Sequence, residues 1–276
     1  MSKDKSDVMP QRPLALVSGA SSGIGREFAR QLAAAGYDLV VVARRKERLE
    51  ALAQEVSRAH GVHADVMQAD LMDEADLARV EKRVASERAL QLLVNNAGFM
   101  RPGTFAVQDL KPQLEMIDLH VKATVRLTRA ALPGMLERNR GAVINVSSVA
   151  GFIQQPQNVV YAATKAFLSS FTEGLALELR GTNVKVQALC PGWTETELLD
   201  HGAVAPNVPS WFVLAPERVV AASLRCLARG KLFCVPSAQY RALVTTAKLS
   251  PRWLLHWMTM RMESMRPAAK PQSDRT

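Results

Sequence analysis

The stretch Leu14-Ala15-Leu16-Val17-Ser18-Gly19-Ala20-Ser21-Ser22-Gly23-Ile24-Gly25 decides the fold of this chain. Its apolar start is typical of a buried strand, and a helical pattern begins at Gly25. The glycines between strand and helix permit a tight turn and let a ligand approach the backbone closely. The N-terminus of the helix offers N–H donors and the positive end of its dipole, which favour a phosphate group. A strand, a glycine-rich turn and a helix in this order predict a dinucleotide-binding unit.

The rest of the chain repeats this alternation of strand and helix. Apolar runs typical of strands lie at residues 14–17, 39–42, 62–69, 90–94, 142–146, 184–189 and 232–235. Helical patterns lie at residues 25–35, 45–60, 74–87, 110–138, 159–180 and 216–228. Continuous apolar strands that alternate with helices predict an α/β fold, doubly wound, with a parallel sheet covered by helices on both faces.

Composition excludes several classes of protein. With 276 residues, 48% of them apolar and 22% charged, one globular α/β domain is expected. No apolar run approaches the ~20 residues that a membrane-spanning helix needs. The polar N-terminus is followed by no apolar signal-peptide segment, and the three cysteines have no metal-binding spacing. We therefore expect a cytoplasmic protein with reduced thiols and no metal site.

The net charge of +9 is concentrated near the C-terminus. From Arg225 onwards, ten Lys and Arg residues are opposed only by Glu263 and Asp274, whereas the body of the chain is nearly neutral. A nucleic-acid-binding protein would carry its basic residues across a larger surface. The charge therefore indicates a local feature of the C-terminal segment and no nucleic-acid partner.

The end of the second predicted strand indicates which nucleotide is bound. An acidic residue at this position usually binds the ribose hydroxyls of NAD. Here the chain has Ala43-Arg44-Arg45-Lys46, and the guanidinium groups of Arg44 and Arg45 suit a 2′-phosphate. The arginines are also electrostatically unfavourable at the start of a helix, which points to a ligand-binding purpose. The pattern favours NADP(H) over NAD(H).

Tyr161 and Lys165 are four residues apart in a predicted helix and therefore share one face. A free tyrosine has a pKa of about 10 and exchanges protons poorly at neutral pH. A neighbouring ammonium group favours the phenolate, so we expect Lys165 to lower the pKa of Tyr161 into a useful range. The pair is a candidate proton-transfer centre.

Five short motifs occur in order along the chain. They are Gly19-xxx-Gly23-x-Gly25, Asn95-Asn96-Ala97-Gly98, Ser147-Ser148, Tyr161-xxx-Lys165 and Pro191-Gly192. Together they resemble the short-chain dehydrogenase/reductase family, including its hydroxysteroid dehydrogenases and ketoacyl reductases. The resemblance covers about residues 13–235 and implies a single-domain Rossmann-like fold with a seven-stranded parallel sheet.

The resemblance also implies roles for single residues. Tyr161 resembles the catalytic acid and base, Lys165 the residue that tunes it and holds the nicotinamide ribose, and Ser148 the serine that hydrogen-bonds the substrate oxygen. Ser147 is the alternative serine, but the spacing to Tyr161 favours Ser148. Asp70 is expected at the adenine amino group. Cofactor contacts are expected at Gly19, Ser21, Ser22, Gly23, Ile24, Gly25, Arg44, Arg45, Asp70, Leu71, Asn96, Ala97, Gly98, Tyr161, Lys165, Pro191, Gly192, Thr194 and Thr196.

His120 departs from the family pattern. It stands where the family usually has an asparagine that bends the helix and binds a water in the proton relay to the lysine. An imidazole can donate and accept hydrogen bonds through its two nitrogens, so His120 could continue the relay. It could equally disrupt the relay, or its nitrogens could be satisfied by backbone groups.

The C-terminal segment follows no family pattern. Ser250 is expected to be the N-cap, and Pro251 the first residue, of an amphipathic helix. Arg252, His256, Thr259, Glu263 and Arg266 form its polar stripe, opposite Trp253, Leu254, Trp257, Met258, Met262 and Met265. The apolar side could pack on the body or on a partner copy, cover a substrate pocket, or lie on a membrane surface.

These observations divide the chain into a flexible N-terminus at residues 1–12, a catalytic domain at 13–235 and a basic amphipathic extension at 236–276. Residues 194–211 lack periodicity and are expected to form a loop or lid. We expect an NADP(H)-dependent oxidoreductase that interconverts a carbonyl and a secondary alcohol on an apolar lipid, steroid or acyl substrate, as a homodimer or homotetramer. The alternative is a catalytically weak nucleotide-binding regulator or scaffold of the same fold.

Overall fold

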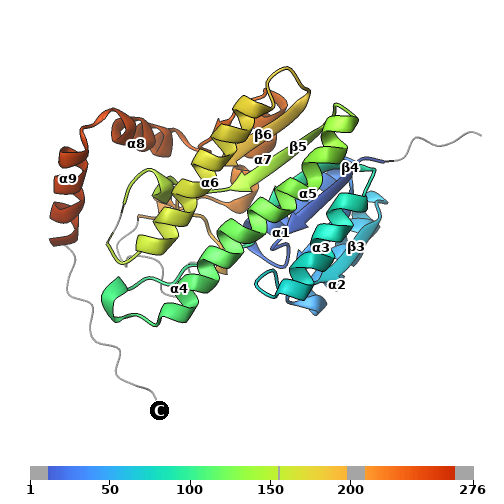
Figure 1. Ribbon diagram of the computed structural model, residues 1–276, viewed down its shortest axis with the longest axis horizontal. Helices are drawn as coiled ribbons and strands as arrows, with labels where there is room; N and C mark the ends of the chain where they lie inside the picture. The colour runs from blue at the N-terminus through green and yellow to red at the C-terminus, as the bar shows by residue number, and fades with distance from the viewer. Residues whose placement is uncertain (1–11, 155, 198–208, 265–276) are drawn as a thin grey trace, which may run out of the picture.

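Seven parallel strands form one sheet in the order β3-β2-β1-β4-β5-β6-β7. The structure is a computed structural model that describes residues 12–154, 156–197 and 209–264 (Figure 1). The predicted doubly wound α/β fold with a seven-stranded parallel sheet is confirmed. The strands are β1 (Leu14–Ser18), β2 (Asp38–Ala43), β3 (Ala64–Gln68), β4 (Leu90–Asn95), β5 (Gly141–Val146), β6 (Val184–Leu189) and β7 (Phe233–Cys234).

Helices cover both faces of this sheet (Figure 1). The helices are α1 (Gly23–Ala34), α2 (Lys46–His60), α3 (Glu74–Ser86), α4 (Leu110–Ile117), α5 (Ala123–Glu137), α6 (Val159–Glu178), α7 (Pro216–Ala228), α8 (Ala238–Leu249) and α9 (Arg252–Ser264). Helices α1, α2 and α7 pack on one face, and α3, α5 and α6 pack on the other.

The side chains of each strand alternate between two apolar cores, as the two-residue period of a strand requires. In β1, Ala15 and Val17 pack against α1, whereas Leu14 and Leu16 join the core under α3 and α5. Because both faces are buried, the strands are apolar at nearly every position. This is why short apolar runs were sufficient to place the strands in the sequence.

The predicted helix at residues 110–138 is divided in the structure. A π-helical segment, Asp118–Lys122, separates α4 from α5, and the buried His120 lies at its centre. π-Helical turns of this kind are often found at functional sites. The π-helical segment places His120 against the loop that follows β4, where the imidazole accepts the Phe99 N–H.

The C-terminal region differs from its prediction in two ways. Helix α8 was not predicted, and its Tyr240 is among the largest fully buried side chains. Helix α9 begins at Arg252, so Ser250 is not its N-cap. The Ser250 N–H instead donates to the Thr246 carbonyl at the end of α8, and the Pro251 carbonyl accepts from Leu254 N–H at 3.0 Å.

Some expectations concern residues that the structure does not describe. The N-terminal segment 1–11 and residues 198–208 of the predicted loop or lid lie outside the described residues, as do the side chains of Met258, Met262, Glu263, Met265 and Arg266. Within the described ranges, no helix has both the length and the apolar character required to cross a membrane.

The direction in which successive strands are added to the sheet reverses between β1 and β4. From β1 the connections run outward to β2 and β3 on one side, and from β4 to β7 on the other. In open parallel sheets, ligands bind at such a switch point, beyond the carboxyl ends of the strands. This edge of the sheet is where the predicted site residues should meet.

Candidate active site

The glycine-rich loop between β1 and α1 can be built only from glycine at its key positions. Gly19 and Gly23 have positive φ angles of 67° and 53°. A Cβ atom on Gly19 would lie 2.8 Å from the Ala97 Cα atom, and one on Gly25 would collide with the Gly19 carbonyl. At the start of α1, the N-cap Ser22 makes no side-chain capping hydrogen bond. The loop therefore presents helix N–H donors to a phosphate, as a dinucleotide requires.

Asn96 ties this loop to the end of β4. Its Nδ2 donates to the Ser18 carbonyl at 2.9 Å and to the Gly19 carbonyl at 3.2 Å. In return, the Ser18 hydroxyl oxygen accepts the backbone N–H groups of Asn96 at 2.9 Å and Ala97 at 3.1 Å. These residues from two motifs thus form one cradle at the switch point.

Arg44 and Arg45 lie beside the same loop. Arg45 Nη2 donates to Ser21 Oγ at 2.9 Å and to Ser22 Oγ at 2.8 Å. Arg44 is largely exposed and lies 3.8 Å from the Asp70 carboxylate. The structure therefore brings together two predicted phosphate ligands and the predicted adenine contact. Two other predicted contacts are apolar and pack inward, Ile24 partly and Leu71 fully buried.

Ser148, Tyr161 and Lys165 meet where β5 ends and α6 passes over it. Ser148 Oγ donates to the Pro191 carbonyl at 3.4 Å and lies near enough to the Tyr161 phenol to favour its ionised form. The Lys165 Nζ lies 5.6 Å from the centroid of the Tyr161 ring and donates to the Val146 carbonyl at 2.9 Å. Ser147 instead donates to the Lys165 carbonyl at 2.7 Å. The geometry therefore leaves Ser148, and not Ser147, beside the phenol.

Burial controls the proton affinities of this group. It raises the pKa of Tyr161 above its usual value, and only the nearby Ser148 hydroxyl opposes this change. Burial also lowers the pKa of Lys165 to about 8. The pKa of Tyr161 therefore moves in the direction opposite to the lowering expected from Lys165, because removal of the phenol from water is the largest effect on it.

His120 is fully engaged by neighbouring groups. Its Nε2 accepts the Phe99 N–H at 3.1 Å, and its Nδ1 lies 2.9 Å from Thr164 Oγ1. Burial, and then the charge of Lys165, lower its pKa well below the usual value. A Cβ atom on Gly98 would lie 2.7 Å from Nε2, so this glycine makes room for the imidazole. Of the three possibilities for His120, a satisfied histidine is the one that the geometry supports, although one of its two partners is the Thr164 side chain and not a backbone group.

The segment after β6 covers the loop and the serine. The Pro191 carbonyl accepts the Val149 N–H at 3.0 Å, which fixes the turn carrying Ser148. Thr194 is buried, and its hydroxyl donates to the Gly192 carbonyl at 3.0 Å. The methyl group of Thr196 lies 2.8 Å from where a Cβ atom of Gly23 would be. The glycine-rich loop, the turn that carries Ser148 and the segment after β6 therefore converge on one edge of the sheet.

Sequence reasoning missed three residues around this site. Thr164 contacts His120, Glu197 contacts Arg45, and Tyr240 packs under Gly192, where any Cβ atom would collide with its ring. The Tyr240 hydroxyl donates to the Phe212 carbonyl at 2.8 Å and accepts the Trp193 N–H at 3.0 Å. These partners are distant in sequence and carry no local motif.

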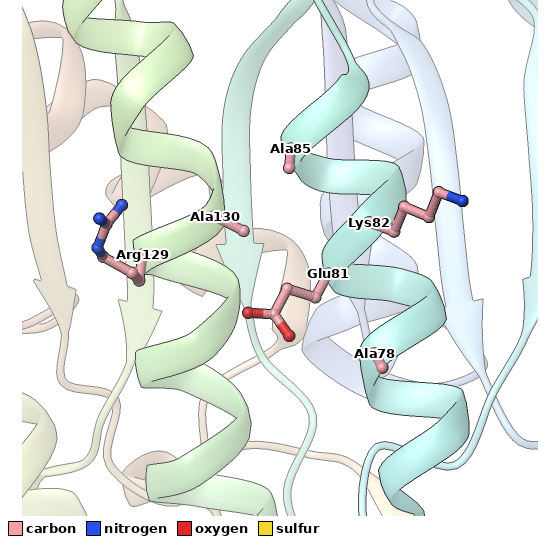
Figure 2. Close-up of a pocket in the computed structure, with 6 residues that line it drawn as sticks. All are labelled: Ala78, Glu81, Lys82, Ala85, Arg129 and Ala130. Atoms are coloured by element: carbon pink, nitrogen blue, oxygen red, sulfur yellow. The ribbon is translucent and has the colours of Figure 1, made fainter.

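A separate groove lies between α3 and α5, where Glu81 points between the helices while Lys82 and Arg129 point away (Figure 2). Its lining residues are Ala78, Glu81, Lys82, Ala85, Arg129 and Ala130, none of which is a predicted site residue. Arg126 already pairs with the Glu81 carboxylate. Among the described residues, no cluster of His, Cys, Asp and Glu has the composition of a metal site.

Comparison with known proteins agrees with this geometry. The profile of a family described as short chain dehydrogenase matches residues 13–203. Sulfoacetaldehyde reductase 2 from Chromohalobacter salexigens is 41% identical over 187 residues, which are 67% of this chain and 73% of that protein.

Two solved structures extend the similarity to nearly the whole chain. A short-chain dehydrogenase from Sphingobium yanoikuyae in complex with NADPH is 35% identical, with a TM-score of 0.79 over 96% of this chain and 100% of that one. A bulky-bulky ketone specific alcohol dehydrogenase from Comamonas testosteroni is 30% identical, with a TM-score of 0.75 over 95% of this chain and 97% of that one. The chain therefore belongs to the short chain dehydrogenase family, and it is an oxidoreductase that acts on carbonyl or alcohol groups with an NAD(P) cofactor.

Proposed function

We propose that this protein is an NADP(H)-dependent oxidoreductase that interconverts a carbonyl group and a secondary alcohol, with Tyr161 as its general acid and base. The observation that carries the proposal is the meeting of Ser148, the Tyr161 phenol and the buried Lys165 ammonium, whose Nζ lies 5.6 Å from the centroid of the Tyr161 ring. These groups stand at the same edge of the sheet as the glycine-rich loop, so a bound nicotinamide can reach the substrate that they hold.

The chemistry requires two hydroxyl groups and one proton. NAD(P)H supplies a hydride to the carbonyl carbon when it is bound. Negative charge then develops on the substrate oxygen, where Ser148 and Tyr161 can each donate a hydrogen bond. Tyr161 delivers its proton to this oxygen, and the charge of Lys165 stabilises the phenolate that remains. In alcohol oxidation the phenolate removes the proton instead.

The preference for NADP(H) is supported by the cationic groups beside the phosphate loop. Arg45 contacts both loop serines, and Arg44 lies next to Asp70. The three residues that follow β2 in the chain are Arg44, Arg45 and Lys46, and none of them is the acidic residue that would bind a free ribose hydroxyl. The complex of the Sphingobium relative with NADPH agrees with this preference.

An apolar, bulky substrate fits the aromatic residues after β6. Phe212 packs its ring against Tyr240, and Trp211 stands on Phe212 with two thirds of its side chain exposed. The named substrates of the relatives differ: one is an aldehyde carrying a sulfonate group, the other a bulky ketone. The exposed Trp211 supports the second class, which includes lipid, steroid and acyl ketones.

Oxidation of NADPH in the presence of a panel of ketones and aldehydes tests the proposal. The panel should contain sulfoacetaldehyde, short aliphatic ketones, steroid ketones and 3-oxoacyl thioesters. Turnover is expected on at least one bulky ketone, and Tyr161→Phe should abolish it while leaving NADPH binding intact. Unchanged turnover in Tyr161→Phe would show that another group supplies the proton.

The alternative function is a nucleotide-binding regulator or scaffold with weak turnover. It is favoured by one observation: both nitrogens of His120 are engaged, so the imidazole has no free position for a proton relay. This alternative predicts tight NADPH binding without turnover on any member of the panel.

Self-association is supported by exposed apolar residues on α4 and α6. Leu110, Leu114 and Ile117 recur at helical spacing along α4, and Phe167 and Leu177 are exposed on α6. Monomers rarely expose such a surface. We propose a homodimer or homotetramer that buries these faces.

The C-terminal extension after residue 235 is proposed to serve an additional contact, beyond a catalytic unit at residues 13–235. Its first helix, α8, is anchored through Tyr240, but Trp253 and Trp257 on α9 remain 70% and 54% exposed. The Arg261 guanidinium lies 5.5 Å from the centroid of the Trp257 ring, and Arg252 precedes Trp253 in the chain. Indoles next to cationic groups support peripheral contact with an anionic membrane surface.

The free thiols of Cys190, Cys226 and Cys234 support a reducing location such as the cytoplasm.

A further inference from the structure

Glu197 lies across the arginines at the start of α2. Its Oε2 accepts a hydrogen bond from Arg45 Nη1 at 2.6 Å, and its Oε1 accepts one from Arg48 Nη1. One carboxylate therefore bridges two guanidinium groups. The hydrogen bond from Arg45, followed by that from Arg48, holds the pKa of Glu197 at about 2. Glu197 is consequently an anion at neutral pH.

The Arg45 guanidinium that Glu197 binds also faces the glycine-rich loop. Arg45 Nε and Nη2 donate to Ser21 Oγ at 3.2 and 2.9 Å, and Nη2 donates to Ser22 Oγ at 2.8 Å. Ser22 precedes the uncapped first turn of α1. Arg45 therefore contacts the N-terminal end of α1 and shares the Glu197 carboxylate with Arg48. A helix N-terminus and a guanidinium group both favour anions.

The backbone holds Glu197 in this position. The Glu195 N–H donates to the Leu214 carbonyl at 2.9 Å, and the Leu214 N–H donates to the Trp193 carbonyl at 2.8 Å. Between these bonds and Glu197, Thr196 packs against Gly23. The anchored backbone of residues 193–196 thus places the Glu197 carboxylate beside the two arginines.

We propose that Glu197 is a specificity-determining residue that competes with the 2′-phosphate of the cofactor for the guanidinium groups of Arg45 and Arg48. This inference rests on the proposed use of NADP(H). A carboxylate and a phosphate are both bound by the donor fork of arginine, and they compete for the same Nη donors. NAD(H) carries a hydroxyl at this position and meets no such competition. Glu197 therefore sets how strongly the protein prefers the phosphorylated cofactor.

Binding of nucleotides to Glu197→Gln tests this inference. Dissociation constants for NADPH and NADH are measured by fluorescence titration, and those for 2′,5′-ADP and 5′-ADP by displacement of NADPH. Only NADPH and 2′,5′-ADP carry the 2′-phosphate. Glu195→Gln is the matched control, because Glu195 is exposed and takes part in no ion pair among the described residues. Glu197→Asp keeps the charge on a shorter side chain, and thermal unfolding verifies that each variant is folded.

Glu197→Gln is expected to tighten binding of NADPH and 2′,5′-ADP by about twofold to fivefold, the effect of removing a partly exposed charge pair that competes with the ligand. Binding of NADH and 5′-ADP should not change, and Glu195→Gln should bind all four ligands like the unmodified protein. Unchanged or weaker NADPH binding in Glu197→Gln overturns the proposal that Glu197 competes with the 2′-phosphate. In that case the proposed function still stands if the unmodified protein prefers NADPH over NADH. If the unmodified protein binds 2′,5′-ADP no better than 5′-ADP, the proposed cofactor preference itself is wrong.

Discussion

The imidazole of His120 is hydrogen-bonded through Nδ1 to Thr164 Oγ1, at 2.9 Å, one residue before Lys165 on α6. The Thr164 hydroxyl donates to the Tyr161 carbonyl at 2.8 Å, so its oxygen accepts the proton of Nδ1. Nε2 must then be the acceptor of the Phe99 N–H. This chain of donors and acceptors assigns the neutral Nδ1–H tautomer. It makes His120 a positioning residue between the loop after β4 and helix α6.

Replacing His120 by asparagine should preserve turnover. The shorter amide can still accept the Phe99 N–H, and the groups around Lys165 lose only the bond between residue 120 and Thr164. We expect kcat within about threefold of the unmodified enzyme, or higher, because no proton passes through the imidazole. His120→Leu is the contrasting variant: it leaves the Phe99 N–H unpaired and should lower the free energy of unfolding by about 1–3 kcal/mol. A collapse of kcat in a stable His120→Asn protein would give the imidazole a chemical role.

The pH dependence of carbonyl reduction should reflect Lys165. Tyr161 remains protonated at neutral pH because burial raises its pKa, so the acid is available. Lys165 has a pKa of about 8 and loses its charge as the pH rises through that value. We expect kcat/KM for reduction to be level between about pH 6 and 7 and to fall above about pH 8. An additional inflection near pH 6.5 that disappears in His120→Asn would contradict the buried neutral state of His120.

Gly192→Ala should destabilise the fold through Tyr240. The added methyl group would collide with the tyrosine ring, which is buried and held by hydrogen bonds to Phe212 and Trp193. Overpacking of this kind costs about 1–3 kcal/mol of unfolding free energy, measured by denaturant titration. Gly174→Ala is the control, since nothing lies within 4 Å of the new methyl group in α6, and it should be neutral or stabilising. Equal stability of the two variants would show that Tyr240 moves without cost.

Arg44→Asp should reverse the cofactor preference. The substitution removes a guanidinium donor and places a carboxylate where a ribose hydroxyl can bind. A charge-assisted hydrogen bond contributes about 1.5–3 kcal/mol, so kcat/KM with NADPH should fall by about tenfold to a hundredfold. Activity with NADH should be equal or greater. Arg58→Asp, the same charge change in the last turn of α2, should leave the ratio unchanged. An unmodified enzyme that already favours NADH would refute the prediction.

Helix α9 should bind anionic vesicles. Co-sedimentation with phosphatidylserine-containing liposomes is expected at low salt and should weaken at high salt, because the basic residues are screened. Trp253→Ser with Trp257→Ser should reduce binding, whereas Trp211→Ser, at another exposed indole, should not. A protein that stays in the supernatant, but dissociates into monomers when both α9 tryptophans are replaced, would assign this face to a partner copy.

The sequence determined the layers of this protein and the pairing of its candidate catalytic residues. Apolar strands such as Leu39-Val40-Val41-Val42 are buried on both faces, and the turn at Gly19 and Gly23 requires residues that tolerate positive φ. Such signals are local, because they depend on neighbours within a few residues. Tyr161 and Lys165 could be paired for the same reason, since one helical turn separates them.

Only the tertiary structure decided how these residues behave. Whether the pKa of Tyr161 rises or falls depends on its burial, and burial depends on elements far away in the chain. The engagement of both His120 nitrogens, the Glu197 bridge to Arg45 and the place of Tyr240 beneath Gly192 each join residues more than 20 positions apart. No periodicity or short motif encodes such pairs, because the contact exists only once the sheet and its helices have packed.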